Sequence, residues 1–264
     1  MTISPNKWEL DVQGYLNTCN ITSATPRKQI RDFSAGVNDL GLWNSMVCWP
    51  LRSSQNAGAG TTAYSLGGLG TFNGTLVGGP SWTDGGVTTD IDTKHIRHEA
   101  GRDFGTGQFT FGACFKQQSF GTAAYAVGLY PSTATAAAYD MGASASGLVD
   151  VLIRNTSSVG GNSRVTAGQM TADTFGFAIA TRSDNTLVST LNGNTTGTSS
   201  TLAAGVNFNR TDIQSVIVGR EATSNLPRNH VTQSFAFIIK GQAIAASSFY
   251  TLYKTTLGQG ITLP

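Results

Sequence analysis

The chain has 264 residues, of which only 12% are charged, and its formal net charge is +2. Ordinary globular proteins carry about 25% charged residues, so much of this surface must consist of uncharged polar side chains and backbone. The small net charge argues against a protein that binds nucleic acid through its electrostatic field. No apolar run approaches the roughly 18 residues that would insert into a membrane, and the length fits one large β-domain with an appended segment.

Residues 1–43 are expected to form a helical hairpin with its turn at 17–23. Apolar residues at helical spacing indicate the first helix: Trp8, Val12, Tyr15 and Leu16. Thr25 followed by Pro26 predicts the start of a second helix, and Gly41 predicts its end. Four apolar residues lie on one face of that helix and a fifth lies just beyond it, and we call this set the apolar stripe: Ile30, Phe33, Val37, Leu40 and Trp43.

The apolar stripe has to be covered, because contiguous apolar patches are rare on soluble monomers. Two alternatives remain open from the sequence. The hairpin could cap the β-domain of its own chain, or the stripe could dock on a partner protein. On the docking alternative, residues 44–264 should fold alone and lose only their assembly with the partner.

From residue 46 onward the sequence predicts short strands. The most regular is 108–116, in which Phe109, Phe111 and Phe115 alternate with small or polar residues, as in a strand buried on one face. Three further alternating sets are assigned with it to the inner faces of one sandwich: Val149, Val151 and Ile153; Phe175, Phe177 and Ile179; Phe235, Phe237 and Ile239. The sequence therefore predicts an all-β domain of two packed antiparallel sheets over residues 44–264.

Turn and end signals complete this arrangement. The Asn192-Gly193 pair predicts a tight hairpin turn. The Ala-rich segment 133–146 is of low complexity and is expected at a surface edge. A last short helix is expected to begin at Ser247 and to stop at Gly258.

No catalytic residues can be assigned from the sequence. The three glutamates, Glu9, Glu99 and Glu221, have no second carboxylate at the spacing that glycoside hydrolysis requires. No G-x-S-x-G motif accompanies the three histidines, and the three cysteines show no C-x-x-C spacing. We therefore expect a protein that is not an enzyme and that needs no cofactor.

Two kinds of binding site remain as hypotheses. Asp90 and Asp92 fall on the same side of a strand and could hold calcium through their carboxylates, although loop aspartates are more often simply solvated. Trp82 and Tyr130 could stack on a glycan, although aromatic residues in such strands more often belong to the core.

Five segments in this order resemble the laminin-G-like, concanavalin A-like jelly roll: NGTLVGGPSWTDGGV, GTGQFTFGACF, TLVSTLNGNTTG, IQSVIVGR and SFAFIIKGQAIAASSFYTLY. The segment RKQIRDFSAGVNDLGLWNSM, which precedes them, resembles one found ahead of such domains in structural proteins of tailed bacteriophages. The first resemblance implies an antiparallel jelly-roll β-sandwich, flanked by the helical hairpin and the last helix.

The second resemblance implies a virion structural protein without enzymatic activity, such as a head decoration or a head or tail fibre component. It would be exposed on the virion surface after assembly in the host cytoplasm. Its partners would be other virion proteins or further copies of itself. The alternative function is a lectin-like carbohydrate-binding module that recognises a host glycan.

Overall fold

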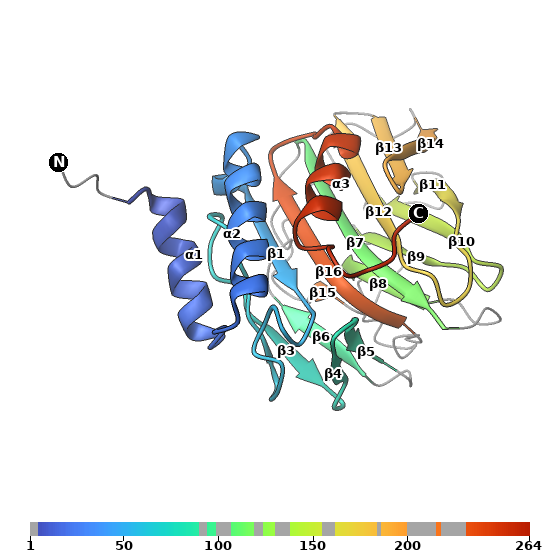
Figure 1. The fold of residues 1–264 in the computed structure, drawn as a ribbon. Helices are drawn as coiled ribbons and strands as arrows, with labels where there is room; N and C mark the ends of the chain where they lie inside the picture. Colours follow the sequence, from blue (N-terminus) through green and yellow to red (C-terminus); the bar gives the residue numbers. More distant parts are fainter. Residues whose placement is uncertain are drawn as a thin grey trace.

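The computed structural model describes residues 5–89, 94–98, 107–118, 124–129, 138–154, 162–183, 186–199, 215–217 and 231–264. Within this part of the chain two antiparallel sheets lie face to face, and helices cover the outer side of one sheet (Figure 1). This is the predicted antiparallel β-sandwich of jelly-roll type.

The first sheet carries the helices. Its strands are, in spatial order, β14 (Asn194–Ser199), β13 (Thr186–Leu191), β12 (Gly176–Ser183), β7 (Phe109–Gln117), β16 (Val231–Lys240), β5 (Gly86–Thr88) and β4 (Ser81–Thr83), and β1 (Met46–Pro50) also pairs with β16. The predicted tight turn between β13 and β14 is confirmed, since Leu191 pairs with Asn194. Asn192 and Gly193 between them adopt positive φ values of 53° and 81°.

The second sheet closes the other side of the sandwich. Its strands are, in spatial order, β11 (Asn162–Gln169), β10 (Leu148–Arg154), β9 (Ala138–Ala143), β8 (Ala124–Leu129), β15 (Ser215–Ile217), β6 (His95–His98), β3 (Gly74–Val77) and β2 (Thr62–Ala63). β9 corrects the prediction that the Ala-rich segment is a surface edge, because it pairs on both sides, with β8 and β10. Its Tyr139 and Met141 are buried in the core.

The predicted helices are present. The hairpin consists of α1 (Lys7–Thr18) and α2 (Ala24–Asp39), and α3 (Ala246–Thr255) follows β16. Gly41 has φ +70° just after α2, as expected at a helix end. α2 and α3 each begin slightly before the predicted residue, after Ser23 and Ala245. No helix in the described ranges has the length and apolar character needed to span a membrane.

The first sheet is buried on both faces, which corrects the expectation of a strand buried on one face. Phe109, Phe111 and Phe115 of β7 point into the sandwich core, while Cys114 of the same strand belongs to a second apolar cluster under the helices. The sequence also assigned five residues of β16 and β12 to the inner face. They face the helices rather than the sandwich core: Phe235, Phe237, Ile239, Phe177 and Ile179. The residues that do face inward between them include Ala178, Ala236 and Ile238, none of which is aromatic.

The apolar stripe is covered by this second cluster. Ile30, Phe33 and Val37 are fully buried and Trp43 is 3% exposed. The ring of Phe33 lies 5.5 Å from that of Phe235 on β16 and 6.0 Å from that of Phe249 on α3, measured between centroids. The docking interpretation is therefore wrong for these four residues, because the chain's own sheet occupies them. Leu40 alone of the stripe is exposed, at 44%.

Candidate functional site

A cleft of about 410 Å³ opens at one end of the first sheet. It lies where β7 ends, where β12 begins and where the turn between β4 and β5 meets the C-terminal segment. We call it the charged cleft, and its lining is Arg52, Asp84, Gly85, Lys116, Asp173, Thr174, Phe175, Gly260, Ile261 and Thr262. Of the 17 Lys and Arg and the 15 Asp and Glu residues in the chain, two of each kind meet in this cleft.

One side of the charged cleft is an ion pair next to an aromatic ring. The ammonium of Lys116 lies 2.6 Å from Asp173 Oδ1 and 5.5 Å from the centroid of the Phe175 ring. Asp173 has φ +55°, and its N–H donates a 2.8 Å hydrogen bond to Gln117 O. The turn before β12 is thereby fixed so that its carboxylate faces the end of β7.

Arg52 builds the other side. Its Nε–H donates to Asp84 O at 2.7 Å and its Nη1–H donates to Gln259 O at 2.7 Å. The side chain thus joins the turn between β4 and β5 to the C-terminal segment. Ser53 Oγ donates to Asp84 Oδ1 at 2.7 Å, which orients the carboxylate while the residue stays exposed.

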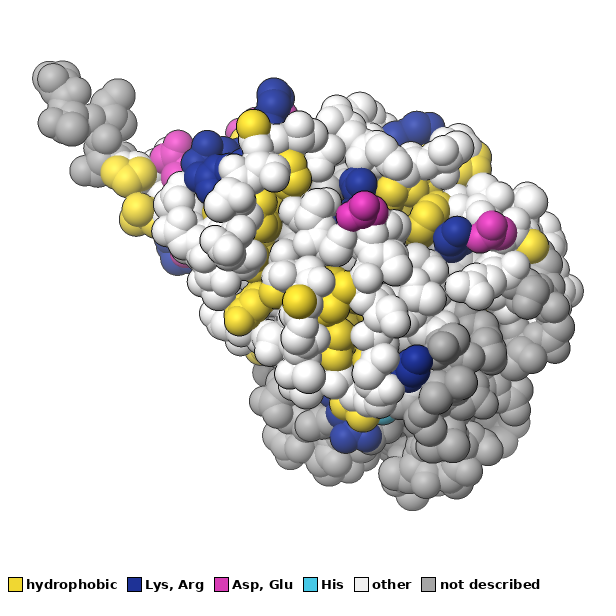
Figure 2. All heavy atoms as spheres, turned by 60° about the horizontal axis from the view of Figure 1, so that its bottom comes forward, with side chains coloured by type: hydrophobic (Ala, Val, Ile, Leu, Met, Phe, Trp, Pro, Cys, Tyr) yellow, Lys and Arg dark blue, Asp and Glu magenta, His cyan; other side chains and the backbone are white. Residues whose placement is uncertain are grey.

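Charged side chains are few on the surrounding surface, but they also form ion pairs outside the cleft. Figure 2 shows a face on which most atoms are white, and on which lysine or arginine side chains touch acidic ones in several places. Paired charges around a half-buried ring offer donors, acceptors and an apolar surface in one small volume. Such a lining suits a small polar ligand with apolar faces.

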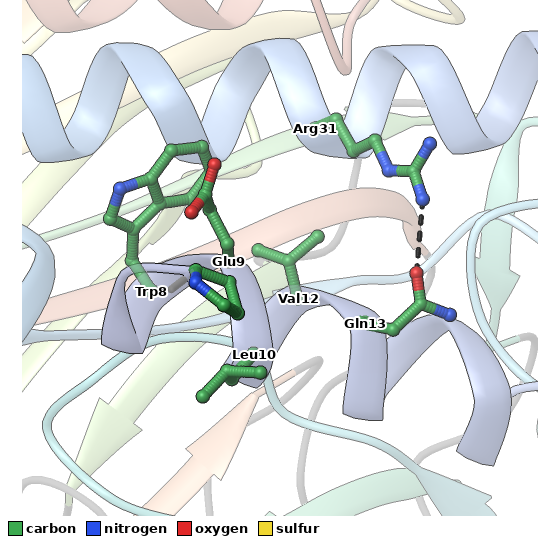
Figure 3. A pocket seen from close by; sticks show the side chains of 7 residues that line it. Trp8, Glu9, Leu10, Val12, Gln13 and Arg31 are labelled. Atoms are coloured by element: carbon green, nitrogen blue, oxygen red, sulfur yellow. Dashed lines mark hydrogen bonds between the residues drawn. The ribbon is translucent and has the colours of Figure 1, made fainter. Parts of the chain in front are cut away.

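A larger hollow of about 560 Å³ lies along the seam between α1 and α2 (Figure 3). Arg31 reaches across this seam from α2 and donates a 3.0 Å hydrogen bond to Gln13 Oε1. Trp8 packs edge-to-face on Trp43, with 6.4 Å between ring centroids. The hollow is mainly an apolar seam with one cation and one carboxylate, Arg31 and Glu9, whereas the charged cleft has two of each. It therefore offers fewer charged groups to orient a polar ligand.

Of the binding residues proposed from the sequence, the structure describes only Trp82. Trp82 on β4 packs against the sandwich core, and its Nε1–H donates to Gly60 O at 3.3 Å. It does not line the charged cleft. Asp90, Asp92 and Tyr130 lie outside the described residues. Among the residues that the structure does describe, no group of three or more His, Cys, Asp or Glu side chains could hold a metal ion.

The buried thiols are not suited to nucleophilic chemistry. Cys19, Cys48 and Cys114 are all buried. Burial raises the pKa of Cys114 from 9.0 to about 11 and that of Cys19 to about 12, and it also raises the pKa of Cys48. A nucleophilic cysteine needs a lowered pKa and access to its substrate, and these three side chains have neither.

Neither a family model nor a curated protein matches the sequence. Solved structures that resemble it include the CBM40 module of the IT-sialidase of Ruminococcus gnavus, at 9% identity and a TM-score of 0.48, covering 60% of this chain and 92% of that chain. The native heptameric SAP-like pentraxin of Limulus polyphemus is 13% identical with a TM-score of 0.40, covering 56% and 70%. The NanB sialidase of Streptococcus pneumoniae is 16% identical with a TM-score of 0.44, covering 55% and 24%. Similarity at this level carries no argument about function.

Proposed function

We propose that this chain is a saccharide-binding module without catalytic activity and that the charged cleft is its binding site. The observation that carries the proposal is the half-buried ring of Phe175 in a cleft that two cations and two carboxylates also line. Sugar rings combine apolar C–H faces with polar hydroxyl edges, so an aromatic ring with convergent polar groups suits them. Hydrogen bonds that involve charged side chains are stronger than neutral ones.

The two carboxylates of the charged cleft support binding rather than hydrolysis. A general acid for glycoside cleavage is usually kept protonated by an apolar environment. The Asp173 side chain is 66% exposed and ion-paired with Lys116, and Asp84 is exposed and accepts a hydrogen bond from Ser53. Both carboxylates are therefore placed to accept hydrogen bonds from hydroxyl groups.

The virion role expected from the leading segment stays a prediction, as does location on a particle surface. A saccharide-binding module is compatible with that role, because a particle protein could use it to adhere to a host glycan. Saccharide binding itself can be tested on the isolated chain.

Binding can be measured by calorimetry with maltohexaose, cellohexaose, mannohexaose and 3′-sialyllactose. We expect at least one of them to bind the wild-type protein. Asp173→Asn and Asp84→Asn should each weaken that binding about tenfold or more, since a hydrogen bond to a charged group contributes about 1.5–3 kcal/mol. Phe175→Leu should also weaken it, because it removes the aromatic face on which a sugar ring would stack. Asp32→Asn is the matched control, because Asp32 forms an ion pair with Lys28 on α2 away from the cleft and should leave binding unchanged.

Two results would overturn the proposal. One is the absence of binding to the whole panel. The other is binding that all three cleft variants leave intact. Release of reducing ends during the same incubation, abolished by Asp84→Asn, would instead identify the charged cleft as the active site of a hydrolase.

A further inference from the structure

A second cleft, of about 430 Å³, lies between α1 and the loop formed by residues 64–73. We propose that this helix–loop cleft is a second binding site of the same module, which takes a neutral saccharide unit. The proposal rests on the proposed function in that it assumes that the chain binds saccharides. It concerns a different set of residues, so the two can fail separately.

The first observation is a glycine in the middle of a helix. Gly14 lies within α1, is exposed, and a Cβ built on it would meet no atom within 4 Å. Glycine is the least favourable helix residue apart from proline, and neither a close contact nor a positive φ requires it here. Gly14 instead lines the helix–loop cleft, where any side chain would project into the open space. A residue that weakens the helix and keeps a cleft open indicates a ligand.

The second observation is the chemistry of the lining. Asp11 is the one charged residue in it, and its side chain is 32% exposed. Its Oδ2 accepts hydrogen bonds from Lys7 at 2.7 Å and from Trp43 Nε1–H at 3.1 Å. These bonds fix the carboxylate in place at the cleft. Such a carboxylate accepts hydroxyl hydrogens and disfavours an anionic ligand.

The apolar part of the lining lies beside this carboxylate. Leu10 is 57% exposed, the largest exposed fraction among the large hydrophobic side chains described. Tyr64 is half-buried on the opposite wall. An apolar contact on each wall and a fixed acceptor next to Leu10 on the helix wall match a sugar ring, which has two C–H faces and hydroxyl groups at its rim.

The third observation is that the loop wall is held rigidly. Asn56 is 2% exposed; its Nδ2–H donates to Tyr64 O at 2.9 Å and its Oδ1 accepts from Tyr64 N–H at 3.0 Å. At the other end of the loop, Asn73 Oδ1 accepts from Ser65 N–H at 3.0 Å. A cleft whose walls are already ordered binds its ligand at a lower entropic cost.

The inference can be tested by NMR titration of the ¹⁵N-labelled protein with maltotriose, cellotriose and mannotriose. We expect the trisaccharide that shifts the Phe175 amide signal to shift those of Gly14 and Gly67 as well. Gly14→Leu should abolish the shifts around the helix–loop cleft and leave those of the charged cleft. Asn17→Leu is the control, because it adds the same side chain to an exposed position of α1 that does not line the cleft.

Thermal stability distinguishes a variant whose cleft is blocked from a variant whose fold is damaged. Gly14→Ala should raise the Tm by about 2–4 °C, because alanine favours the helix and nothing opposes its methyl group. Loss of binding in a Gly14→Leu protein that melts no earlier than the wild type then supports a site. Shifts confined to the charged cleft would overturn this inference and leave the proposed function standing. Shifts at neither cleft would also overturn this inference, and the proposed function would then depend on the calorimetry panel alone.

Discussion

At the scale of single residues, the alternation of a strand does not reveal which of its faces is the inner one. From Phe109 to Phe115 of β7, the residues on both faces are apolar or small and all are buried. Gly112 shows how closely the helix-facing layer is packed: a Cβ on it would lie 2.6 Å from an atom of the Phe237 ring and 2.5 Å from Ala178 O. The large aromatic rings could be placed on the wrong face because both faces are buried.

Burial of Cys114 predicts a loss of stability in alkaline solution. Its pKa is raised from 9.0 to about 11 in the folded protein, chiefly by burial. Between these values the unfolded chain has lost a proton that the folded protein keeps. The stabilisation is therefore complete below about pH 9 and decreases towards pH 11, by up to about 1.4 kcal/mol per pH unit for this group.

Urea denaturation of the wild type and of Cys114→Ala at pH 7, 9 and 10.5 measures how much Cys114 contributes to the pH dependence of stability. We expect the unfolding free energy of the wild type to fall more steeply with pH than that of the variant, even though the variant starts from a lower value at pH 7. Parallel pH dependences for the two proteins would show that Cys114 ionises equally in the folded and unfolded chains.

At the scale of elements, local sequence signals were sufficient to predict an element where one residue pair or one apolar helix face defines its structure. The turn at Asn192-Gly193 and the two helices of the hairpin belong to this class. β11 and β14 were not predicted as strands, because β14 consists only of Asn, Thr, Gly and Ser and the apolar residues of β11 are limited to Val165 and Ala167. Pairing with neighbouring strands, which no local pattern records, stabilises such segments.

The apolar stripe on α2 gives a prediction at the same scale. Phe33→Asp should destabilise the protein by more than about 4 kcal/mol, because it removes a buried ring and places an isolated carboxylate in an apolar cluster. Leu40→Asp, at the exposed end of the same stripe, should change stability by less than about 1 kcal/mol. Urea midpoints of the two variants make the comparison. A Phe33→Asp protein as stable as Leu40→Asp would restore the docking interpretation.

At the scale of the whole molecule, the candidate site joins parts of the chain that are distant in sequence. Lys116 and Asp173 are 57 residues apart, and Arg52 and Gln259 are 207 apart. The sequence could offer Trp82 and the aspartates near residue 90 as isolated candidates. It could not bring Arg52, Lys116 and Phe175 together, because only the sheet order places the end of β7 beside the start of β12 and the C-terminal segment.

The two apolar clusters share one sheet, and this predicts that the hairpin and the sandwich unfold together. β7 contributes side chains to both clusters, and the fully buried Ile30, Phe33 and Val37 of α2 lie over this sheet. Burial of a side chain of this size contributes about 1.5–3 kcal/mol, so detaching α2 would cost a large part of a total stability of about 5–15 kcal/mol. It would also uncover Phe235, which belongs to an aromatic layer with Phe177 and Phe237.

Hydrogen exchange followed by mass spectrometry can measure this coupling in the intact chain. The slowest amides of α2 should open with a free energy within about 1 kcal/mol of those of β7, because both require the same cooperative unfolding. The amides of α1 serve as an internal comparison, since this helix packs on the outside of the hairpin (Figure 1) and should open more readily. Exchange of α2 long before β7 would mean that residues 1–43 are a separable unit. The boundary expected at residue 44 would then be a true domain boundary, and the aromatic layer would be stable without its cover.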